Sequence, residues 1–241
     1  MIIKPIKTRI FRERDDLFSF ISHYFKKIPE KSVIIVTSKI VALAEGRTAE
    51  IKNKKTKEEL IRKESDLALR TKHVWLTIKD GSVMSSAGID ESNGNGKLIL
   101  LPIDSFKTAS DLRKRLQKKY KVKNLGVAIV DSRTMPLRAG VVGSALGYAG
   151  FRGIKKYKGT PDIFGRKFKF SRTNVADSLA TAAVLSMGEG KEKQPLAIIT
   201  DIPIKFSDKV VSKELQIDIK DDMYRPLFAK LPKSQKRYIA L

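Results

Sequence analysis

The sequence contains no cysteine and only two histidines, His23 and His73, among its 241 residues. The absence of cysteine excludes disulfide bonds and thiolate metal sites. Two histidines give little basis for a histidine-ligated zinc site or a Ser-His-Asp triad. The candidate metal and phosphate ligands considered below are therefore oxygen atoms and cationic side chains.

Long hydrophobic runs are also missing. The longest runs, VIIV and LILLPI, are far shorter than the roughly 20 apolar residues that a membrane-spanning helix needs. The N-terminal stretch MIIKPIKTRIF has charges where a signal peptide has its apolar core. We therefore expect a cytoplasmic protein without a membrane partner.

Acidic residues are outnumbered: 49 Lys and Arg stand against 26 Asp and Glu, which gives a formal net charge of +23. A field of this sign attracts nucleic acid, nucleotides or phosphorylated metabolites. The alternative is an ordinary solvated basic surface, because the lysines are spread over segments such as 52–57 and 113–123. Aromatic residues are few and do not alternate with these runs, which argues against a platform for stacked bases, so nucleic acid is not expected as a partner.

Hydrophobic periodicity predicts alternating strands and helices, with Ser38 as the point where the first buried strand changes to a helix. The predicted strands are 2–6, 124–132, 139–151 and 196–200. Residues 32–46 are predicted to start as a strand and continue as a short helix, and residues 74–89 to form a hairpin. The predicted helices are 14–27, 56–70, 105–120 and 173–187. Residues 160–168 are predicted to form a turn and 188–195 a loop. The order of the predicted strands and helices does not repeat a regular βαβ pattern, so we expect an α+β fold with mixed or antiparallel sheets and packed helices.

The segment SAGIDESNGNG (86–96) combines small residues with Asp90, Glu91 and Asn93. It does not match a calcium-binding EF-hand loop or a phosphate-binding Walker A sequence. Its oxygen ligands suit Mg²⁺ or Mn²⁺ carrying the phosphates of a nucleotide. The alternative is a turn that closes a hairpin and is stabilised by its own Asp and Asn side chains.

Further candidate residues follow predicted strands and helices. Asp131 and Ser132 come at the end of a buried strand, where they could bind a metal or only cap the turn. Arg138 could clamp a phosphate or lie on the surface. Asp162 and Arg166 could pair with each other or reach a ligand. Gly188, Glu189 and Gly190 follow a predicted helix and form either a nucleotide-contacting loop or a plain glycine C-cap.

The order and spacing of several motifs resemble those of the coenzyme F420-0:γ-glutamyl ligase family, over nearly the whole chain to about residue 200. The matching segments are SKIVALAEGR (38–47), AGIDESN (87–93), IVDSRTMPLRAGVVGSALGYAG (129–150), DIFGR (162–166) and NVADSLATAAVLSMGEG (174–190). The resemblance implies a single domain over residues 1–241, built as two intertwined α+β lobes, that forms a homodimer.

The resemblance also implies an activity: a GTP-dependent ligase that joins L-glutamate to the carboxylate of F420-0 or a related anionic, phosphorylated acceptor. In this family GTP activates the acceptor as an acyl phosphate, which the amine of glutamate then attacks. Mg²⁺ or Mn²⁺, together with a monovalent cation such as K⁺, assists the reaction.

Site residues can be transferred by position from the same resemblance. Asp90, Asp131 and Ser132 are implied as metal ligands, with Ser132 in place of the family's Thr. The implied nucleotide contacts are Thr8, Arg9, Ile10, Phe11, Ser38, Lys39, Asn93, Gly188, Glu189 and Gly190. No residue is assigned as a catalytic acid or base.

The sequence departs from the family pattern at four positions and in the N-terminal segment 8–11, where TRIF replaces an LPLI-like segment. Leu43 replaces a nucleotide-contacting lysine, Thr134 and Met135 replace a Gly and an Arg, and Ser178 replaces an acid. This pattern suits a paralogue that acts on another acceptor. It also suits a second hypothesis, a non-catalytic protein that binds a nucleotide or RNA on the same scaffold.

Overall fold

The computed structural model describes residues 1–51 and 53–228, so the last part of the predicted C-terminal region, residues 229–241, lies outside the described residues. The chain forms two compact units. The first combines Met1–Gly46 with Pro102–Leu215, and the second combines Arg47–Leu101 with the segment from Gln216 on. Helices accompany mixed and antiparallel sheets, which confirms the predicted α+β class. The expected single domain of two intertwined lobes stays a prediction.

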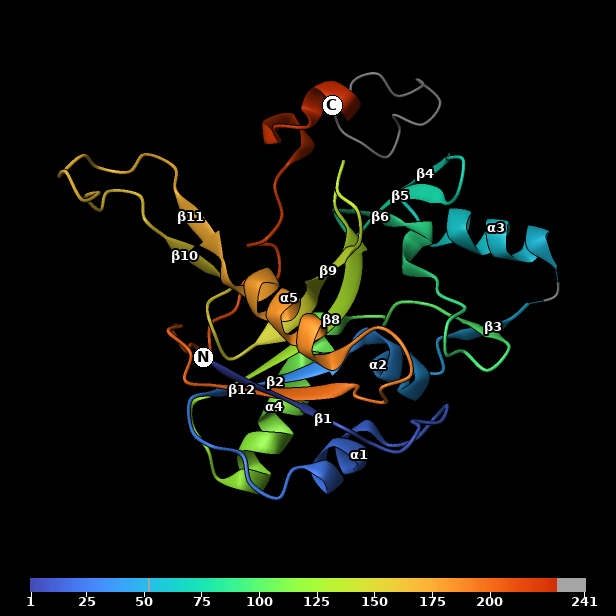
Figure 1. Cartoon of the computed structure of the whole chain (residues 1–241), viewed down its shortest axis with the longest axis horizontal. Coiled ribbons are helices and arrows are strands. Elements are labelled where there is room, and N and C mark those ends of the chain that lie inside the picture. The colour runs from blue at the N-terminus through green and yellow to red at the C-terminus, as the bar shows by residue number, and fades with distance from the viewer. Residues whose placement is uncertain (52, 229–241) are drawn as a thin grey trace. The chain divides into compact units, whose positions relative to one another are not determined.

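The first unit is built on a five-stranded mixed sheet in the order β1-β12-β2-β8-β9 (Figure 1). Its strands are β1 (Ile2–Ile6), β2 (Ser32–Thr37), β8 (Leu125–Thr134), β9 (Val141–Ala149) and β12 (Leu196–Thr200). Only β2 and β8 pair in parallel, and the other neighbours are antiparallel. Two parallel neighbours bring their carboxyl ends to the same edge of the sheet, which is a frequent position for binding sites.

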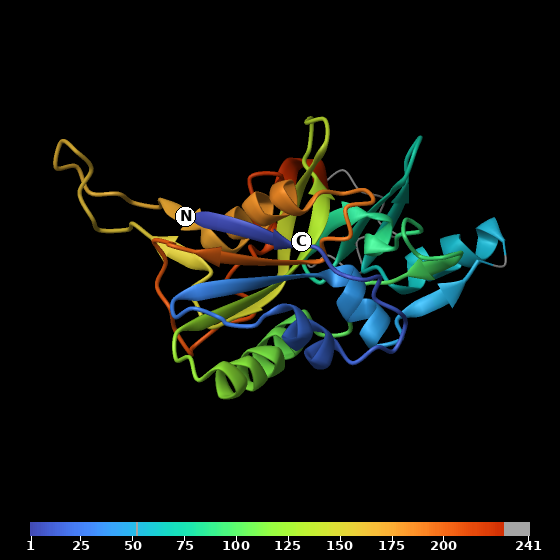
Figure 2. The ribbon, with the colours of Figure 1, turned by 60° about the horizontal axis from the view of Figure 1, so that its bottom comes forward.

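Both faces of this sheet are buried because side chains alternate along each strand. In β2, Ile34 and Val36 belong to one hydrophobic cluster, whereas Val33 and Ile35 belong to the other. The first cluster packs against α1 (Leu17–Tyr24), α2 (Ser38–Ala44) and α4 (Ser105–Tyr120), and the second packs against α5 (Val175–Met187). Figure 2 shows α5 on one side of the sheet and α1 and α4 on the other.

Helix α5 starts at Val175, two residues after the predicted start at 173, because Asn174 acts as an N-cap and accepts a hydrogen bond from the backbone N–H of Asp177. Asp104 caps α4 in the same way by accepting from Lys107. The change from strand to helix at Ser38 and the helix over 105–120 are both confirmed.

Two glycines of β9 allow helix backbone to lie directly on the strand. A Cβ atom at Gly143 would come within 2.3 Å of the carbonyl oxygen of Ala180 in α5, and one at Gly147 would meet backbone of Ser105 at 2.3 Å. The two glycines face opposite sides of the sheet, because the pairing of β8 with β9 skips Leu146 and so reverses the alternation. The glycine-rich motif therefore serves packing against both α4 and α5.

A two-stranded ribbon, β10 (Ile154–Lys156) and β11 (Arg172–Asn174), extends from the first unit. The sequence predicted only a turn at 160–168 here and missed both strands. Short strands rich in lysine and arginine carry no clear hydrophobic alternation, so pattern recognition has little to detect.

The second unit contains two small sheets. One pairs β3 (Thr48–Glu50) with β7 (Lys97–Ile99), and the other has the order β4-β5-β6. The latter strands are β4 (Leu67–Arg70), β5 (Trp75–Lys79) and β6 (Ser82–Ser85), and the remaining elements are α3 (Lys54–Lys63), η1 (Ser86–Gly88), η2 (Ile219–Asp221) and α6 (Arg225–Phe228).

The predicted hairpin at 74–89 is confirmed. Its turn residues Asp80 and Gly81 both have positive φ, as a type I′ turn requires. The predicted start of α3 at Thr56 is wrong: the side chain of Asn53 caps the helix by accepting from the backbone N–H of Thr56. Within the described part of the chain, no helix is both long and apolar enough to cross a membrane.

We predict that Gly143→Ala lowers the free energy of unfolding by about 1–3 kcal/mol, because the added methyl group forces α5 away from β9. Urea unfolding followed by circular dichroism measures this change. Gly190→Ala is the matched control, since its Cβ would lie 3.4 Å from the mobile end of the Glu192 side chain. Equal stability of both variants would show that β9 and α5 are not in tight contact.

Candidate functional site

The best-defined polar cluster of the first unit lies at the carboxyl ends of the parallel strands β2 and β8. The register pairs Thr37 with Val130, so the next residues, Ser38 and Asp131, come side by side. The hydroxyl of Ser38 donates a hydrogen bond of 2.8 Å to the Asp131 carboxylate. Two residues that the sequence predicted separately, 93 positions apart, therefore form one site.

Burial dominates the electrostatics of Asp131. Loss of solvent raises the pKa of its carboxyl group, and the Ser38 hydroxyl and the charges of Arg133 and Lys39 oppose that shift only in part. A carboxylate held in such surroundings binds a cation readily, because a cation restores the favourable interactions that burial removed.

Ser132 points to the other face of the sheet, as alternation along β8 requires. Its hydroxyl donates a hydrogen bond to the carboxylate of Glu189. Glu189 immediately follows Gly188, the C-cap of α5, and α5 packs on that same face. The structure thus brings together a predicted metal ligand and a predicted nucleotide contact.

The predicted N-terminal contact segment joins the loop that contains Glu189. The backbone N–H of Thr8 donates a hydrogen bond of 2.8 Å to the carbonyl of Lys193. Thr8 is buried, whereas Ile10 is exposed. Phe11 belongs to the hydrophobic core and packs edge-on against Phe20, so a ligand can meet this residue only through its backbone.

Arg9 is held by its own neighbours. Its guanidinium donates to the Asp15 carboxylate at 2.6 Å and lies 5.0 Å from the ring centre of Phe20. Its backbone N–H donates to the hydroxyl of Tyr24. These contacts fix the shape of the segment from Thr8 to Phe11.

In the second unit, SAGIDESNGNG forms the turn that the sequence offered as an alternative. Asp90 exchanges backbone hydrogen bonds with Ile99, and its carboxylate accepts from the backbone N–H and the hydroxyl of Ser92, each at 2.7 Å. Glu91 forms an ion pair with Lys57 at 2.5 Å. Asn93 is exposed and has a positive φ.

The backbone just before Asp90 is strained. Ser86 and Ala87 both adopt the left-handed region, with φ of 50° and 55°, and the buried Ala87 is anchored to the Thr77 hydroxyl. Strain of this kind tends to occur at functional sites. The turn is therefore both a hairpin end and a candidate binding segment.

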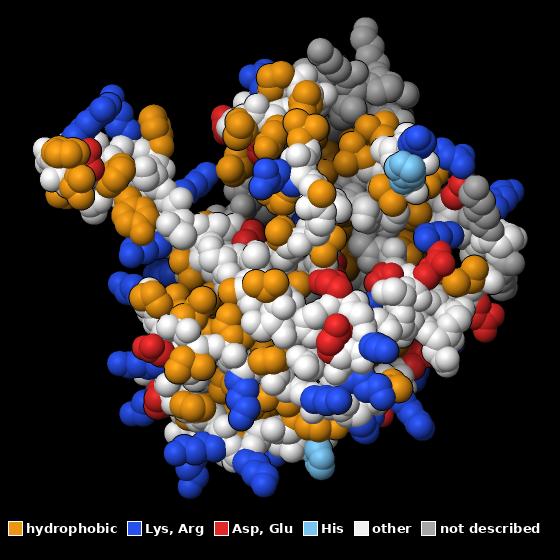
Figure 3. All heavy atoms as spheres, viewed as in Figure 1, with side chains coloured by type: hydrophobic (Ala, Val, Ile, Leu, Met, Phe, Trp, Pro, Cys, Tyr) orange, Lys and Arg blue, Asp and Glu red, His pale blue; other side chains and the backbone are white. Residues whose placement is uncertain are grey.

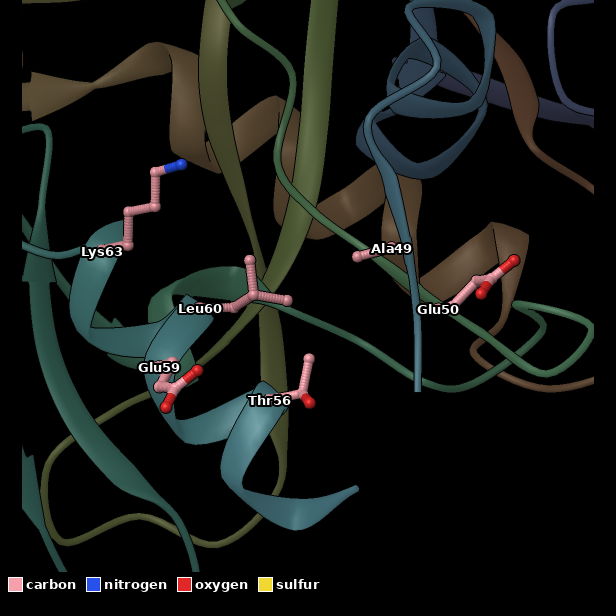
Figure 4. Close-up of a pocket in the computed structure, with 6 residues that line it drawn as sticks. All are labelled: Ala49, Glu50, Thr56, Glu59, Leu60 and Lys63. Carbon is pink, nitrogen blue, oxygen red and sulfur yellow. The ribbon is translucent and has the colours of Figure 1, made fainter. Parts of the chain in front are cut away.

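Other candidates remain isolated. Arg138 is exposed between β8 and β9. Asp162 accepts hydrogen bonds from the backbone N–H groups of Phe164 and Arg166, so its carboxylate shapes a turn. A hollow of about 450 Å³ in the second unit is lined by Ala49, Glu50, Thr56, Glu59, Leu60 and Lys63, none of which the sequence predicted as a site residue (Figure 4).

The described residues contain no group of three or more His, Cys, Asp or Glu side chains able to hold a metal ion. Mg²⁺, however, is usually held by one or two protein carboxylates together with phosphate oxygens and water. The oxygens of Asp131 and Ser132 in the first unit, and of Asp90 in the second, suit that chemistry.

Arg133, whose charge lowers the pKa of Asp131, is not among the site residues predicted from the sequence. Its position could have been predicted, because Arg133 follows Asp131 by two residues and residues two apart on a strand lie on the same face. This spacing is weak evidence for a site residue, because an arginine that follows a predicted strand is usually on the surface.

Comparison with known proteins identifies relatives along most of the chain. The family model for F420-0:gamma-glutamyl ligase matches residues 5–201. Coenzyme F420:L-glutamate ligase of Methanococcus maripaludis (strain C7) is 32% identical over 227 residues, which cover 87% of this chain and 90% of the relative. The proteins of the same name from Methanopyrus kandleri and Archaeoglobus fulgidus are each 30% identical over 213 residues. Those alignments cover 80% and 81% of this chain, and 83% and 85% of the relatives.

We predict that Asp131 makes the protein less stable as the pH rises. The folded state holds a proton on this carboxyl group more tightly than the unfolded state, whose pKa is about 3.9. The protonated Asp131 therefore makes its full contribution to the free energy of unfolding below a pH of about 3.9. That contribution is lost as the pH rises through the raised pKa of the folded state.

Urea unfolding at a series of pH values measures the free energy of unfolding. As the pH rises, this free energy should fall less for Asp131→Asn than for the wild type, and at pH 7 the variant should be equally or more stable. Asp111→Asn is the control, because Asp111 is exposed and its nearest cation, Lys114, is 3.9 Å away. Identical pH profiles for wild type and Asp131→Asn would contradict the prediction.

Proposed function

The chain belongs to the F420-0:γ-glutamyl ligase family, and on this basis we propose that it joins L-glutamate to the carboxylate of coenzyme F420 or a related phosphorylated acceptor. The observation that carries the proposal is the partly buried Asp131, placed beside Ser38 at the carboxyl edge of β2 and β8. A poorly solvated carboxylate with a raised pKa suits a site that receives cations and phosphates.

The proposed reaction has two steps. The acceptor carboxylate attacks the γ-phosphorus of GTP, which releases GDP and gives an acyl phosphate. The amine of glutamate then attacks the acyl carbon, phosphate leaves, and the amine loses a proton as the amide forms. Positioning and electrostatic stabilisation supply most of the catalysis in such phosphoryl transfers.

Mg²⁺ or Mn²⁺ fits the oxygen ligands that these residues provide. We propose Asp131 and Ser132, whose side chains lie on opposite faces of β8, as ligands of separate ions in the first unit, and Asp90 as a ligand in the second unit, with K⁺ as a monovalent partner ion. A bound divalent ion would neutralise phosphate charge. Ser38 orients the Asp131 carboxylate, and Glu189 orients the Ser132 hydroxyl.

We propose that the nucleotide contacts the same region of the first unit. Lys39 supplies positive charge close to Asp131, and the loop Gly188–Glu189–Gly190 and the segment from Thr8 to Phe11 are joined by the Thr8–Lys193 hydrogen bond. Within the second unit, Asn93 is a proposed nucleotide contact. The active form is proposed to be a homodimer.

A second candidate function is non-catalytic binding of a nucleotide or RNA. Leu43, which replaces a lysine of the family pattern, packs against the hydrophobic core of the first unit. Thr134 and Met135 are exposed at the end of β8. Together with the net charge of +23, these replacements favour a protein that has kept anion binding without the ligase reaction.

Calorimetric titration of GTP with and without Mn²⁺ is the first test of the site. We predict metal-dependent binding that Asp131→Asn and Asp90→Asn each weaken by about tenfold or more, because each variant loses a carboxylate proposed to bind a metal ion. Asp111→Asn should bind as the wild type does. Binding that is unchanged in both site variants would contradict the proposed metal ligands.

Activity separates the two candidate functions. A ligase should release phosphate from GTP only when glutamate and the acceptor are both present, and mass spectrometry should detect the glutamyl product. The non-catalytic alternative predicts no turnover, and its RNA-binding form predicts affinity that falls steeply with salt in both wild type and Asp131→Asn.

A further inference from the structure

Strand β8 extends beyond the end of its parallel neighbour β2. The parallel pairing ends at Val130, whereas β8 continues to Thr134 in antiparallel pairing with β9. Asp131 and Arg133 both belong to this extension, and Arg133 pairs with Val142. Both positions are therefore held by strand pairing, which fixes a side chain more closely than a loop does.

Arg133 lies on the same face of the sheet as Asp131. Ile129 belongs to the hydrophobic cluster that packs against α2, and Asp131 accepts a hydrogen bond from Ser38 at the start of α2. Because alternate residues of a strand share a face, Arg133 follows them on this face. Its charge acts on the carboxyl group of Asp131, as does the charge of Lys39. The carboxyl edge of β2 and β8 thus combines one carboxyl group with two cationic side chains.

Both cations lie at the border between the core and solvent. Residues 125–130 of β8 are buried, residues 131–133 are half-buried, and residues 134–141 are exposed. Lys39 is half-buried as well. Half-burial removes part of the water that a cation binds, and an anionic ligand restores the lost interactions. Arg133 therefore stands where an anion from solution can reach it and gain from the contact.

A guanidinium group is well suited to phosphate. It presents five N–H donors in a planar fork and keeps its charge throughout the physiological pH range. A bidentate pair with a carboxylate uses two of these donors, so an arginine beside a carboxylate has donors left for a second anion. Arg133 can therefore serve Asp131 and a phosphate group at the same time.

Basic side chains on open surface are a different class. Figure 3 shows them along the lower edge of the first unit, where Figure 1 places α1 and α4. Lys114, Arg115 and Lys118 are exposed on α4. Solvent and salt screen such groups, so each attracts an anion only weakly. Arg133 and Lys39 differ from them in being half-buried and in lying close to a carboxyl group.

We propose that Arg133 binds the polyphosphate chain of the nucleotide, on the face of the sheet that also presents Asp131 and Lys39. The inference rests on the proposed function, because it adds a residue to the site where GTP is proposed to bind. The guanidinium donates two hydrogen bonds to phosphate oxygens. When the acceptor carboxylate attacks phosphorus, Arg133 offsets the repulsion between the negative charges of the two reactants.

Calorimetric titration compares the full-length wild type with Arg133→Gln, Arg133→Lys and the control Arg115→Gln, each in the presence of Mn²⁺. Arg133→Gln should weaken the binding of GTP and of inorganic tripolyphosphate by about tenfold or more, because charge-assisted hydrogen bonds are lost. Arg133→Lys should fall between that variant and the wild type, because lysine keeps the charge but not the fork. Arg115→Gln removes the same charge from the exposed face of α4 and should bind as the wild type does.

Titration with Mn²⁺ alone separates a phosphate contact from an indirect effect through Asp131. Removal of a nearby positive charge does not weaken the binding of a cation, so Arg133→Gln should bind Mn²⁺ at least as tightly as the wild type. Weaker binding of Mn²⁺ by Arg133→Gln would show that Arg133 only positions Asp131, and would overturn the proposal. Circular dichroism verifies that the variants are folded, and Arg133→Lys provides the comparison if Arg133→Gln does not fold.

The outcomes distinguish this proposal from the proposed function. Metal-dependent GTP binding that is equal in the wild type and Arg133→Gln would overturn the role of Arg133 and leave the ligase proposal in place. So would an effect of Arg133→Gln confined to the binding of coenzyme F420-0. Phosphate release from GTP, with glutamate and coenzyme F420-0 present, is measured on the same samples. Absence of turnover in the wild type, combined with tripolyphosphate binding that depends on Arg133, would reject the ligase proposal and keep the phosphate contact.

Discussion

The parallel pairing of β2 with β8 is the constraint on which the rest of the first unit depends. These strands are buried on both faces, so each must alternate apolar side chains toward α1, α2 and α4 on one side and toward α5 on the other. That requirement fixes the register, because a slip of one residue would exchange the two faces. The register in turn places Ser38 beside Asp131 at the shared carboxyl edge of the two strands.

Alternation continues beyond the core and distributes the polar residues of the site. Asp131 and Arg133 follow Ile129 on the face of α2, and Ser132 follows Val130 on the face of α5, where Glu189 lies. The cost of this arrangement is a poorly solvated carboxylate at Asp131. Such a group opposes folding at neutral pH, which is a reason to interpret it as functional: a purely structural position would be served better by an uncharged side chain.

The second unit and the ribbon of β10 and β11 are the other parts of the chain. The chain leaves the first unit after Gly46 and returns at Pro102, so the turn containing Asp90 belongs to an insertion between β2 and β8. The strained backbone before Asp90 and the hydrogen bonds from Ser92 give the turn a defined shape. The ribbon of β10 and β11, by contrast, keeps the apolar side chains of Ile163 and Phe164 exposed.

Local sequence by itself determined the main elements: the helix over 105–120 and the strand-to-helix change at Ser38 follow from periodicity, and the hairpin at Asp80–Gly81 follows from turn chemistry. The resemblance of its motifs determined the family. Only the tertiary structure decided that Ser38 meets Asp131 and that Ser132 meets Glu189, since these contacts depend on strand register and helix packing between residues far apart in the chain. It also decided the opposite facing of Gly143 and Gly147, because the bulge at Leu146 arises from pairing with β8 and leaves no mark in local periodicity.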